Sequence, residues 1–555
     1  MSRSLPPRES TGDDVTVDTR SAGHAIVEQL AHLGVDRAYL VPGESFLDVL
    51  DGLRDSPIDT VVCRHEGGAG FMALADARLN DDVGVAMVTR GPGAANAAIA
   101  VHTAWQDCTP LLLFVGLVPV ADRGRESFQE FSIEGWFGTT AKRVIVLDDP
   151  GRTCSMIRDA HHLAQAGRPG PVVVGLPEEL LREPCPEPVR PARSQVCDPH
   201  PETLRRLAEL VAAAERPLVV CGGDRVDGGA SRHLRRWVEA WELPVVSDFR
   251  AHDKLDHDSP SWCGALGYGR SGSAAALLER ADLVVHLDSV HGDVLSDGYT
   301  LGDAGRRVVL VGSDPDARGH EGPIDLYVPC LPGPALRALA GIDPPSARPW
   351  APVTEEARAA YVEWTRPRPD APSGPGVDLG AVMGLLAERL EADTVVTYGA
   401  GNHAIWAQRY LPAHACPSVL SPRNGAMGFG VPAAVAAAIS QPGRRVVTVA
   451  GDGCFLMNGQ ELAVAAARGG RLLAIVVDNG QYGTIRAHQE AQYPGRVSGT
   501  ELVNPDFARL AEGYGGRAWT ARTTADAVVA VEEALAHDGV ALVHLLVDPA
   551  VLAPR

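Results

Sequence analysis

The chain has 555 residues, of which 45% are hydrophobic and 22% are charged, and its formal net charge is −20. This length exceeds a single hydrophobic core, so two to four domains are expected. Binding to nucleic acid or to an anionic membrane needs a basic protein surface, and the acidic balance argues against both partners. No apolar run approaches the ~18–20 residues that a membrane-spanning helix needs.

The first 18 residues and the cysteine pattern indicate a cytoplasmic protein with a disordered N-terminal tail. Residues 1–18 are polar, contain Pro6 and Pro7, and lack the apolar centre of an export signal. They predict a disordered tail. The ten cysteines are scattered and form no C-x-x-C pair. This pattern is typical of reduced thiols in the cytoplasm.

Three stretches alternate short apolar runs with helical patterns, which is typical of parallel sheets covered by helices. We expect domains at 19–184, 201–343 and 377–555, separated by proline-rich linkers at 185–200 and 344–376. The predicted fold is therefore α/β, with three domains that each hold a mainly parallel sheet flanked by helices. The expected strands lie at 38–41, 60–63, 83–89, 111–115, 171–174, 217–221, 244–247, 283–287, 307–311, 394–398, 445–450, 472–477 and 541–547.

Two strand ends in the third stretch carry oxygen ligands. The strand at 445–450 ends in Gly451-Asp452-Gly453, and the strand at 472–477 ends in Asp478-Asn479-Gly480. The glycines let backbone N–H groups approach phosphate oxygens, and the side-chain oxygens of Asp452 and Asn479 suit Mg²⁺. The two ligands are 479 − 452 = 27 positions apart, one strand–helix–strand crossover. Each motif alone is also typical of an ordinary turn.

With Asn479 following Gly451-Asp452-Gly453, the chain resembles the thiamine diphosphate-dependent enzymes, and in particular their acetolactate synthase-like group. Further stretches are similar in order and spacing to the pyrimidine-binding domain of that group, and the resemblance runs from about residue 20 to 550. These stretches are VCRHEGGAGFMALADA at 62–77, TRGPGAA at 89–95, PLLLFVG at 110–116, SFQE at 127–130 and GRPGPVVVGLP at 167–177.

The resemblance implies a site that binds thiamine diphosphate and Mg²⁺. Asp452, Asn479 and the backbone carbonyl of Gln481 would hold the metal. Met427 would wedge the cofactor into its bent shape, and His403 would contact the diphosphate. From the residues alone, Met427 also fits core filling and His403 a polar helix start. The implied cofactor-binding set is Gly43, Glu66, Pro92, Asn96, Asn402, His403, Gly425, Met427, Gly451, Asp452, Gly453, Asn479, Gln481, Tyr482 and Gly483.

Glu66 is the candidate catalytic carboxylate. It follows the strand at 60–63 and opens an alanine-rich helix. One interpretation is a first-turn Glu that complements the helix dipole. The resemblance implies instead that Glu66 hydrogen-bonds the cofactor's pyrimidine ring and thereby drives loss of the thiazolium C2 proton. His65 and Gln129 are candidates for later proton transfers.

The implied activity is that of a C–C lyase or transferase. A 2-oxo acid such as pyruvate would lose CO₂, and the resulting enamine would add to a second carbonyl compound. The alternative is a nonoxidative decarboxylase of a bulkier, benzoylformate-type 2-oxo acid. Glu44 and His488 depart from the acetolactate synthase pattern, and Arg486 disfavours a simple pyruvate decarboxylase. A non-catalytic relative would not need Glu66.

The resemblance also bears on partners and on flavin. In the family the carboxylate and the diphosphate site of one centre come from different subunits, which implies a homodimer or homotetramer. The sequence does not identify a small regulatory subunit. The stretch DSVHGD at 288–293 lacks the arginines that contribute to flavin binding, so binding of FAD is in doubt.

Overall fold

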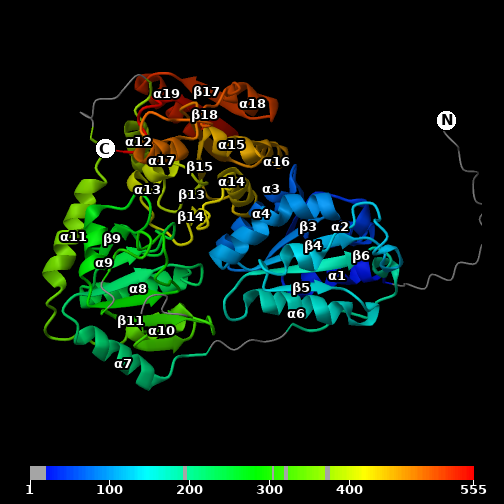
Figure 1. Ribbon diagram of the computed structural model, residues 1–555, viewed down its shortest axis with the longest axis horizontal. Helices are drawn as coiled ribbons and strands as arrows, with labels where there is room; N and C mark the ends of the chain where they lie inside the picture. Colours follow the sequence, from blue (N-terminus) through cyan, green and yellow to red (C-terminus); the bar gives the residue numbers. More distant parts are fainter. Residues whose placement is uncertain (1–19, 192–196, 303–304, 318–322, 369–375, 555) are drawn as a thin grey trace, which may run out of the picture.

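The computed structural model describes residues 20–191, 197–302, 305–317, 323–368 and 376–554. The predicted tail at 1–18 lies outside these residues. The chain forms three parallel sheets of six strands each, and helices flank them. In Figure 1 the third domain lies at the top, the first at the right and the second at the lower left. The predicted three-domain α/β fold is confirmed.

The sheet of the first domain has the strand order β2-β1-β3-β4-β6-β5. Its central strands β4 and β6 are buried along their whole length, which explains their continuous apolar sequences. The strands are β1 (Arg37–Leu40), β2 (Asp59–Val62), β3 (Gly84–Val88), β4 (Leu111–Leu117), β5 (Arg143–Val146) and β6 (Pro171–Pro177). The helices are α1 (Ala22–His32), α2 (Leu47–Arg54), α3 (Glu66–Asn80), α4 (Gly91–Asp107), α5 (Ile133–Phe137) and α6 (Thr153–Gln165).

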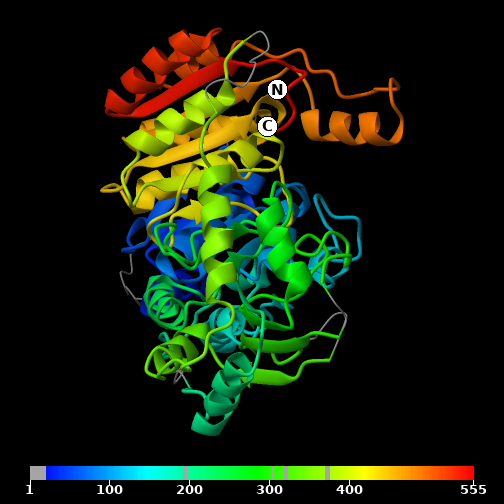
Figure 2. The ribbon, with the colours of Figure 1, turned by 90° about the vertical axis from the view of Figure 1, so that its left-hand side faces the viewer.

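The third domain repeats this strand order as β14-β13-β15-β16-β18-β17. Its strands are β13 (Val395–Tyr398), β14 (Val419–Leu420), β15 (Val446–Gly451), β16 (Leu472–Asp478), β17 (Arg517–Ala521) and β18 (Val540–Leu546). Its helices are α12 (Leu379–Arg389), α13 (His403–Tyr410), α14 (Gly430–Ser440), α15 (Asp452–Asn458), α16 (Leu462–Ala467), α17 (Gly483–Gln492), α18 (Phe507–Gly513) and α19 (Thr524–Ala536). Figure 2 shows the orange segment that contains α17 projecting from one side of this domain.

The second domain has the order β12-β11-β10-β7-β8-β9, a doubly wound arrangement that reverses between β7 and β10. Its strands are β7 (Pro217–Cys221), β8 (Val245–Ser247), β9 (Trp262–Ala265), β10 (Leu283–Leu287), β11 (Arg307–Gly312) and β12 (Leu326–Pro329). The helices are α7 (Pro201–Ala212), α8 (Gly228–Trp241), α9 (Gly272–Arg280), α10 (Pro332–Leu339) and α11 (Ala351–Trp364).

Helix α11 corrects one expectation, since it lies inside the range 344–376 predicted as a plain linker. A proline in the first turn starts the helix instead of preventing it. Its buried face of Thr354, Ala357 and Tyr361 packs on α9 and β9 of the second domain. The proline content of this range therefore marks a helix start as well as a connection.

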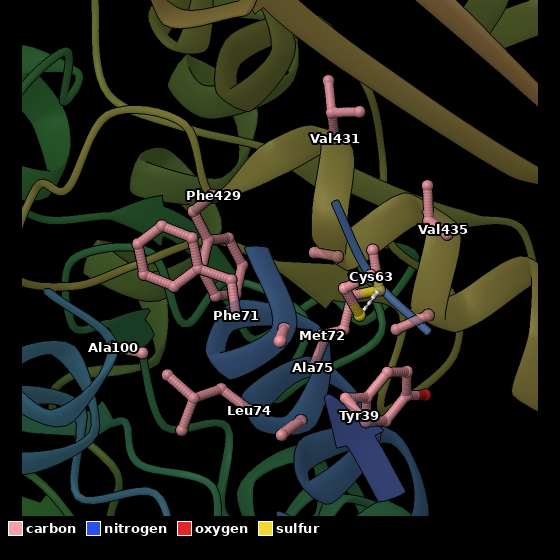
Figure 3. Packing of buried hydrophobic residues seen from close by; sticks show 14 of the residues in the cluster. Tyr39, Cys63, Phe71, Met72, Leu74, Ala75, Ala100, Phe429, Val431 and Val435 are labelled. Carbon is pink, nitrogen blue, oxygen red and sulfur yellow. Dashed lines mark hydrogen bonds between the residues drawn. The ribbon is translucent and has the colours of Figure 1, made fainter. Parts of the chain in front are cut away.

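The first and third domains share one hydrophobic core, formed where α3 packs against α14. Phe71 of α3 and Phe429 at the start of α14 meet edge to face, with ring centroids 5.3 Å apart. Figure 3 shows these two rings side by side, and Val431 and Val435 of α14 belong to the same cluster. This packing fixes the orientation of α3, whose first residue is Glu66.

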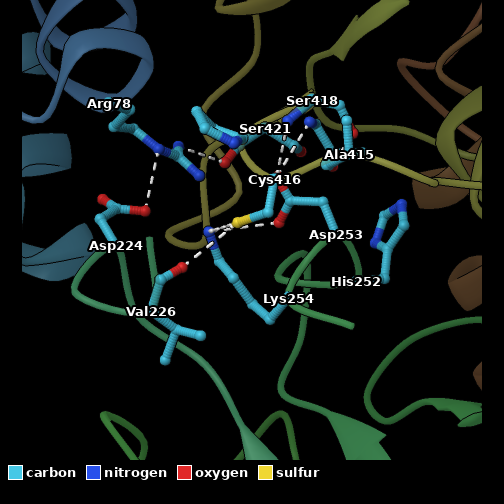
Figure 4. A network of polar contacts seen from close by, with 12 residues as sticks. Arg78, Asp224, Val226, His252, Asp253, Lys254, Ala415, Cys416, Ser418 and Ser421 are labelled. Carbon is cyan, nitrogen blue, oxygen red and sulfur yellow. Dashed lines mark hydrogen bonds and ion pairs between the residues drawn. The ribbon is translucent and has the colours of Figure 1, made fainter. Parts of the chain in front are cut away.

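Buried charges join all three domains at a second contact. Arg78 of the first domain lies 3.2 Å from Asp224 of the second and donates to the Ser421 carbonyl oxygen of the third at 2.9 Å. Figure 4 shows these groups pointing toward one another. Among the described residues, no helix is long and apolar enough to cross a membrane.

Candidate active site

A cavity of about 260 Å³ opens at the carboxyl ends of β13, β15 and β16, and its lining residues all lie between positions 400 and 485. Ligands of open α/β sheets bind at such places, where the strand order reverses, here between β13 and β15. All eleven cofactor-binding residues predicted in the third domain line it. They are Asn402, His403, Gly425, Met427, Gly451, Asp452, Gly453, Asn479, Gln481, Tyr482 and Gly483.

Strand register brings the two predicted metal ligands to the same edge. Gly451 of β15 pairs with Val477 of β16, so Asp452 and Asn479 both follow the paired ends. Asp452 accepts a hydrogen bond from the Gly453 N–H at 2.9 Å, and burial raises its pKa to about 6. The side-chain oxygen of Asn479 accepts from the Gln481 N–H at 3.2 Å. These hydrogen bonds orient the carboxylate and the amide.

Asp478, Asn504 and His544 form a hydrogen-bonded group that reaches the predicted metal ligand Asp452. The Asn504 amide donates to Asp452 and to Asp478, at 2.8 Å each. His544 lies 2.8 Å from the other oxygen of Asp478. Burial opposes ionisation of Asp478, but the hydrogen bonds from His544 and Asn504 outweigh it and lower its pKa. Sequence reasoning missed Asn504 and His544, because only the pairing of β16 with β18 and the return of the 500–506 loop bring them here.

The remaining cavity groups fit a diphosphate and Mg²⁺. His403 is buried, and its Nε2 has no hydrogen-bond partner among the described residues. Burial lowers the pKa of His403 to about 3, so the ring is neutral and can offer one N–H. The carbonyl oxygen of Gln481 accepts from the Gly483 N–H at 2.9 Å and keeps its second lone pair. A carboxylate, an amide oxygen and a carbonyl oxygen make a donor set that Mg²⁺ prefers.

Glu66 lies in a different place from this cavity. It begins α3 at the carboxyl end of β2 and accepts a hydrogen bond from the Asn96 amide at 2.9 Å. The predicted pair of Glu66 and Asn96 is therefore in contact. The His65 ring caps α3, since its Nδ1 accepts from the Gly67 N–H at 3.0 Å. Glu66 is half-buried and is absent from the cavity lining of its own chain.

The other predicted residues of the first domain gather around neighbouring strand ends. Gly43 follows β1, and a Cβ at this position would lie 2.5 Å from the Cβ of Thr89, so only glycine fits. Pro92 lies in the first turn of α4. The carbonyl oxygen of Gln129 accepts from the Gly91 N–H at 3.1 Å. The first domain thus presents its candidates at the carboxyl edge of β1, β2 and β3.

The second domain does not fit a flavin dinucleotide. Its crevice between β7 and β10 starts at Gly223, where a Cβ would lie 1.7 Å from a carboxylate oxygen of Asp288. That carboxylate accepts from the Arg225 N–H at 3.1 Å, and the half-buried Asp248 nearby accepts from the Ser289 hydroxyl at 2.6 Å. Acidic side chains therefore fill the position at which a dinucleotide diphosphate would bind.

Comparison with known proteins agrees with this architecture. Models of the thiamine pyrophosphate enzyme N-terminal, central and C-terminal domains match residues 20–136, 204–339 and 399–545. Because these matches cover most of the chain in the expected order, the chain belongs to the thiamine pyrophosphate enzymes, which use the cofactor also called thiamine diphosphate. The predicted family is confirmed, and the chain is an enzyme of this class.

Within the class, the relatives include acetolactate synthases. The chain is 31% identical to the acetolactate synthase large subunit IlvB1 of Mycobacterium tuberculosis over 519 residues, which are 90% of this chain and 84% of that protein. It is 28% identical to the acetolactate synthase isozyme 2 large subunit of Escherichia coli K12, covering 94% and 95%. A solved thiamine diphosphate-dependent 4-hydroxybenzoylformate decarboxylase of Rhodococcus jostii RHA1 shares the fold, with a TM-score of 0.83, 23% identity, and coverage of 95% and 99%.

Proposed function

We propose that the chain is a thiamine diphosphate- and Mg²⁺-dependent carboligase, which decarboxylates a 2-oxo acid such as pyruvate and joins the remaining acyl unit to a second carbonyl compound. The observation that carries the proposal is the single cavity lined by all eleven predicted residues of the third domain. The acetolactate synthase relatives support the carboligase reaction. When bound, the cofactor supplies a carbanion that attacks the carbonyl carbon and a cationic ring that accepts electrons as CO₂ leaves.

The proposal gives each residue a physical task. Asp452, Asn479 and the Gln481 carbonyl hold Mg²⁺, which neutralises the diphosphate. Met427, which lines the same cavity, would hold the cofactor in its bent shape. Glu66 hydrogen-bonds the pyrimidine ring and so favours loss of the C2 proton.

His65 and Gln129 are the proposed groups for later proton transfers. The Nδ1 atom of His65 caps α3, which leaves Nε2 for a proton. The backbone of Gln129 is held against Gly91 at the start of α4, so its side chain stays near the first-domain candidates.

We also propose that the active form is a homodimer, or a dimer of dimers, with each centre shared between two chains. Glu66 does not line the cavity of its own chain, so a second chain must supply this carboxylate. Large apolar side chains are exposed beside both halves of the site. Val62 and Ile99 flank the Glu66 region, and Met457 and Ile485 flank the cavity. Helix α17, which begins at the cavity, buries only Gly483. A partner chain would cover these groups. We also infer a cytoplasmic location, because the ten scattered cysteines are typical of reduced thiols.

Hybrid dimers test the shared centre. One chain carries Glu66→Gln and the other Asp452→Ala, and two different affinity tags isolate the hybrid. In a shared arrangement one centre takes both changes and the other takes neither, so the hybrid should regain about half of the wild-type carboligation rate while each parent homodimer is inactive. If each centre belonged to one chain, both centres of the hybrid would carry one defect. An inactive hybrid therefore refutes the shared centre.

The decarboxylase of a bulkier 2-oxo acid is the second candidate, because the fold of the 4-hydroxybenzoylformate decarboxylase covers nearly the whole chain. Products are identified by mass after incubation with pyruvate alone, with pyruvate and an aldehyde, and with benzoylformate. A 2-hydroxyketone or 2-hydroxy-2-methyl acid product supports the carboligase. If benzoylformate yields free benzaldehyde and no ligation product forms, the carboligase is refuted and the decarboxylase is supported. NMR measurement of C2-proton exchange tests the proposed catalytic role of Glu66. Wild-type protein should accelerate the exchange of bound cofactor, and Glu66→Gln should abolish this acceleration.

A further inference from the structure

Glu461 is a completely buried carboxylic acid of the third domain whose hydrogen-bond donors belong to the first domain. It ends the short 3-10 helix η5 (Gly459–Glu461). The backbone N–H of Arg64 donates to both of its carboxylate oxygens, at 3.1 Å each. The backbone N–H of His65 also bonds this carboxylate. Both donors immediately precede Glu66, so Glu461 holds the turn that carries the catalytic carboxylate.

The glycine at position 68 shows how closely this carboxyl group is enclosed. A Cβ on Gly68 would lie 2.5 Å from a carboxylate oxygen of Glu461 and 2.9 Å from its carboxyl carbon. Gly68 lies within α3 and has an ordinary helical conformation, so backbone freedom does not explain the glycine. The close approach of Glu461 does. Two separate features of the first domain, the turn and the glycine, are thus shaped around one side chain.

The segment that ends in Glu461 begins with the predicted metal ligand Asp452. Within this segment, 452–461, Cys454 accepts from the Gly428 N–H at 3.2 Å, and the Asn458 amide donates to the Gly428 carbonyl oxygen at 3.0 Å. Gly428 follows the proposed wedge residue Met427. One stretch of ten residues therefore contacts the metal site, the wedge loop and the Glu66 turn.

We propose that Glu461 is a positioning residue for Glu66 of the same chain. The hydrogen bonds to Arg64 and His65 fix the first turn of α3, and this turn sets the direction of the Glu66 carboxyl group. Because Glu66 does not line the cavity of its own chain, segment 452–461 links the metal site of one active centre to the carboxylate of the other. This inference rests on the proposed function, in which Glu66 acts on the cofactor of a partner chain.

The principal experiment compares Glu461→Ala with a matched control, Asp253→Ala. Asp253 is also a buried carboxyl group at a domain boundary, where it accepts from the Ser418 and Val419 N–H groups at 2.9 and 3.1 Å. C2-proton exchange, cofactor affinity by calorimetry and thermal unfolding are measured for each. Glu461→Ala should slow exchange roughly 10- to 100-fold, the cost of a small misplacement of a catalytic group, and leave cofactor affinity close to wild type. Asp253→Ala should lose stability and keep the exchange rate.

Two further variants separate positioning from general destabilisation. Glu461→Gln keeps an acceptor oxygen and should retain most of the exchange rate. Gly68→Ala pushes a methyl group into the carboxyl group and should reproduce the defect of Glu461→Ala. The double variant Gly68→Ala with Glu461→Ala should be no slower than the slower single variant, because both disrupt one contact. If Glu461→Ala does not fold, Gly68→Ala and Glu461→Gln decide the question.

Hybrid dimers then identify which centre Glu461 serves. The starting hybrid combines a Glu66→Gln chain with an Asp452→Ala chain. Added to the Asp452→Ala chain, which supplies the remaining Glu66, Glu461→Ala should lower the recovered activity roughly 10- to 100-fold. Added to the Glu66→Gln chain, it should have little effect. The reverse pattern would show that Glu461 supports only the metal site of its own chain, and would overturn the inference.

The outcomes distinguish this inference from the proposed function. Wild-type protein that does not accelerate C2-proton exchange refutes the proposed function. Normal acceleration in wild type that persists unchanged in Glu461→Ala and Gly68→Ala refutes only the positioning role. An inactive starting hybrid refutes the shared centre, and exchange in the homomeric variants still decides whether Glu461 positions Glu66.

Discussion

Replacing Asp224 by Ala should loosen the junction of the three domains. Asp224 accepts from the Arg423 guanidinium at 2.6 Å and from the Thr109 hydroxyl at 3.0 Å, and lies 3.2 Å from the Arg78 guanidinium. The Asp107 carboxylate contacts the same two arginines: it accepts from the backbone N–H of Arg423 at 3.0 Å and lies 3.7 Å from the Arg78 guanidinium. Two cations and two anions thus balance in a buried cluster that spans all three domains (Figure 4 shows Arg78 with Asp224).

The expected loss of stability follows from the charge left behind. Burial opposes ionisation of Asp224, but Arg423 and Arg78 outweigh it and hold its pKa far below the ordinary range. A lowered pKa contributes stability above the unfolded pKa of about 3.9, and loses it only as pH falls through the folded value. At pH 7 the contribution is therefore complete. Asp224→Ala leaves a buried positive charge uncompensated, which costs about 3–5 kcal/mol.

Urea unfolding at pH 7, together with amide hydrogen exchange of the segments around Arg78 and Arg423, measures this effect. The control removes an exposed ion pair on α7 by Glu202→Ala, and should cost no more than about 1 kcal/mol. The double variant Asp224→Leu with Arg423→Met should recover part of the loss, since apolar replacement removes the unpaired charge. If Asp224→Ala were no more destabilising than the surface control, the reasoning about buried charge would be refuted.

Three other perturbations test the core, the metal support and one titration. Burial raises the pKa of Glu461 to about 7, so its stabilising contribution is complete below the unfolded pKa and falls as pH rises toward 7. The free energy of unfolding of the apo protein is measured at pH 5 and pH 8 for wild type and for Glu461→Gln. Between these pH values the variant should gain up to about 3 kcal/mol relative to wild type. A difference between variant and wild type that is equal at both pH values would contradict the raised pKa. Asn504→Ala removes the amide that orients Asp452, and calorimetry should show Mg²⁺ affinity reduced about 10- to 100-fold. Phe71→Ala empties the contact with Phe429 and should cost about 3–5 kcal/mol in thermal unfolding; a loss below that of a surface variant would show that the shared core carries little energy.

The strands that sequence patterns predicted are chiefly the inner ones of each sheet. An inner strand of a parallel sheet is covered on both faces, so its sequence is a continuous apolar run. Of the six edge strands, only β2 carries enough of this signal to be predicted; β9 is buried along its length, but it has four residues, one of them a glycine. In β12 and β17 most residues are partly buried or exposed, and β14 has two residues. The strands not predicted are β5, β9, β12, β14 and β17, and each lies at the edge of its sheet.

Site residues could be predicted where a polar residue directly follows an apolar strand, because this pattern is visible in a short stretch of sequence. Asp452 and Asn479 directly follow strong apolar strands, so their neighbourhood could be inferred from the order of the chain. Glu461 carries no such signal, because it lies within the crossover between these two strands, where the sequence pattern predicts a single helix. The structure breaks that stretch at Gly459 into α15, η5 and α16, and the break directs Glu461 toward the first domain. Its hydrogen-bond partners become visible only when two domains that are far apart in the sequence pack together.

The equal strand order of the first and third domains gives a geometric reason for a shared centre. Each sheet reverses between its first and third strands, β1 and β3 in one and β13 and β15 in the other, and each gathers its polar groups at that edge. Within one chain, the side chains of Phe71 and Phe429 fill the contact between α3 and α14. The Glu66 edge and the Asp452 cavity therefore remain open on separate parts of the same chain. In the proposed dimer, a two-fold axis that sets one chain's Glu66 edge against the other's cavity would close both centres at once, and it would bury the exposed apolar side chains beside them.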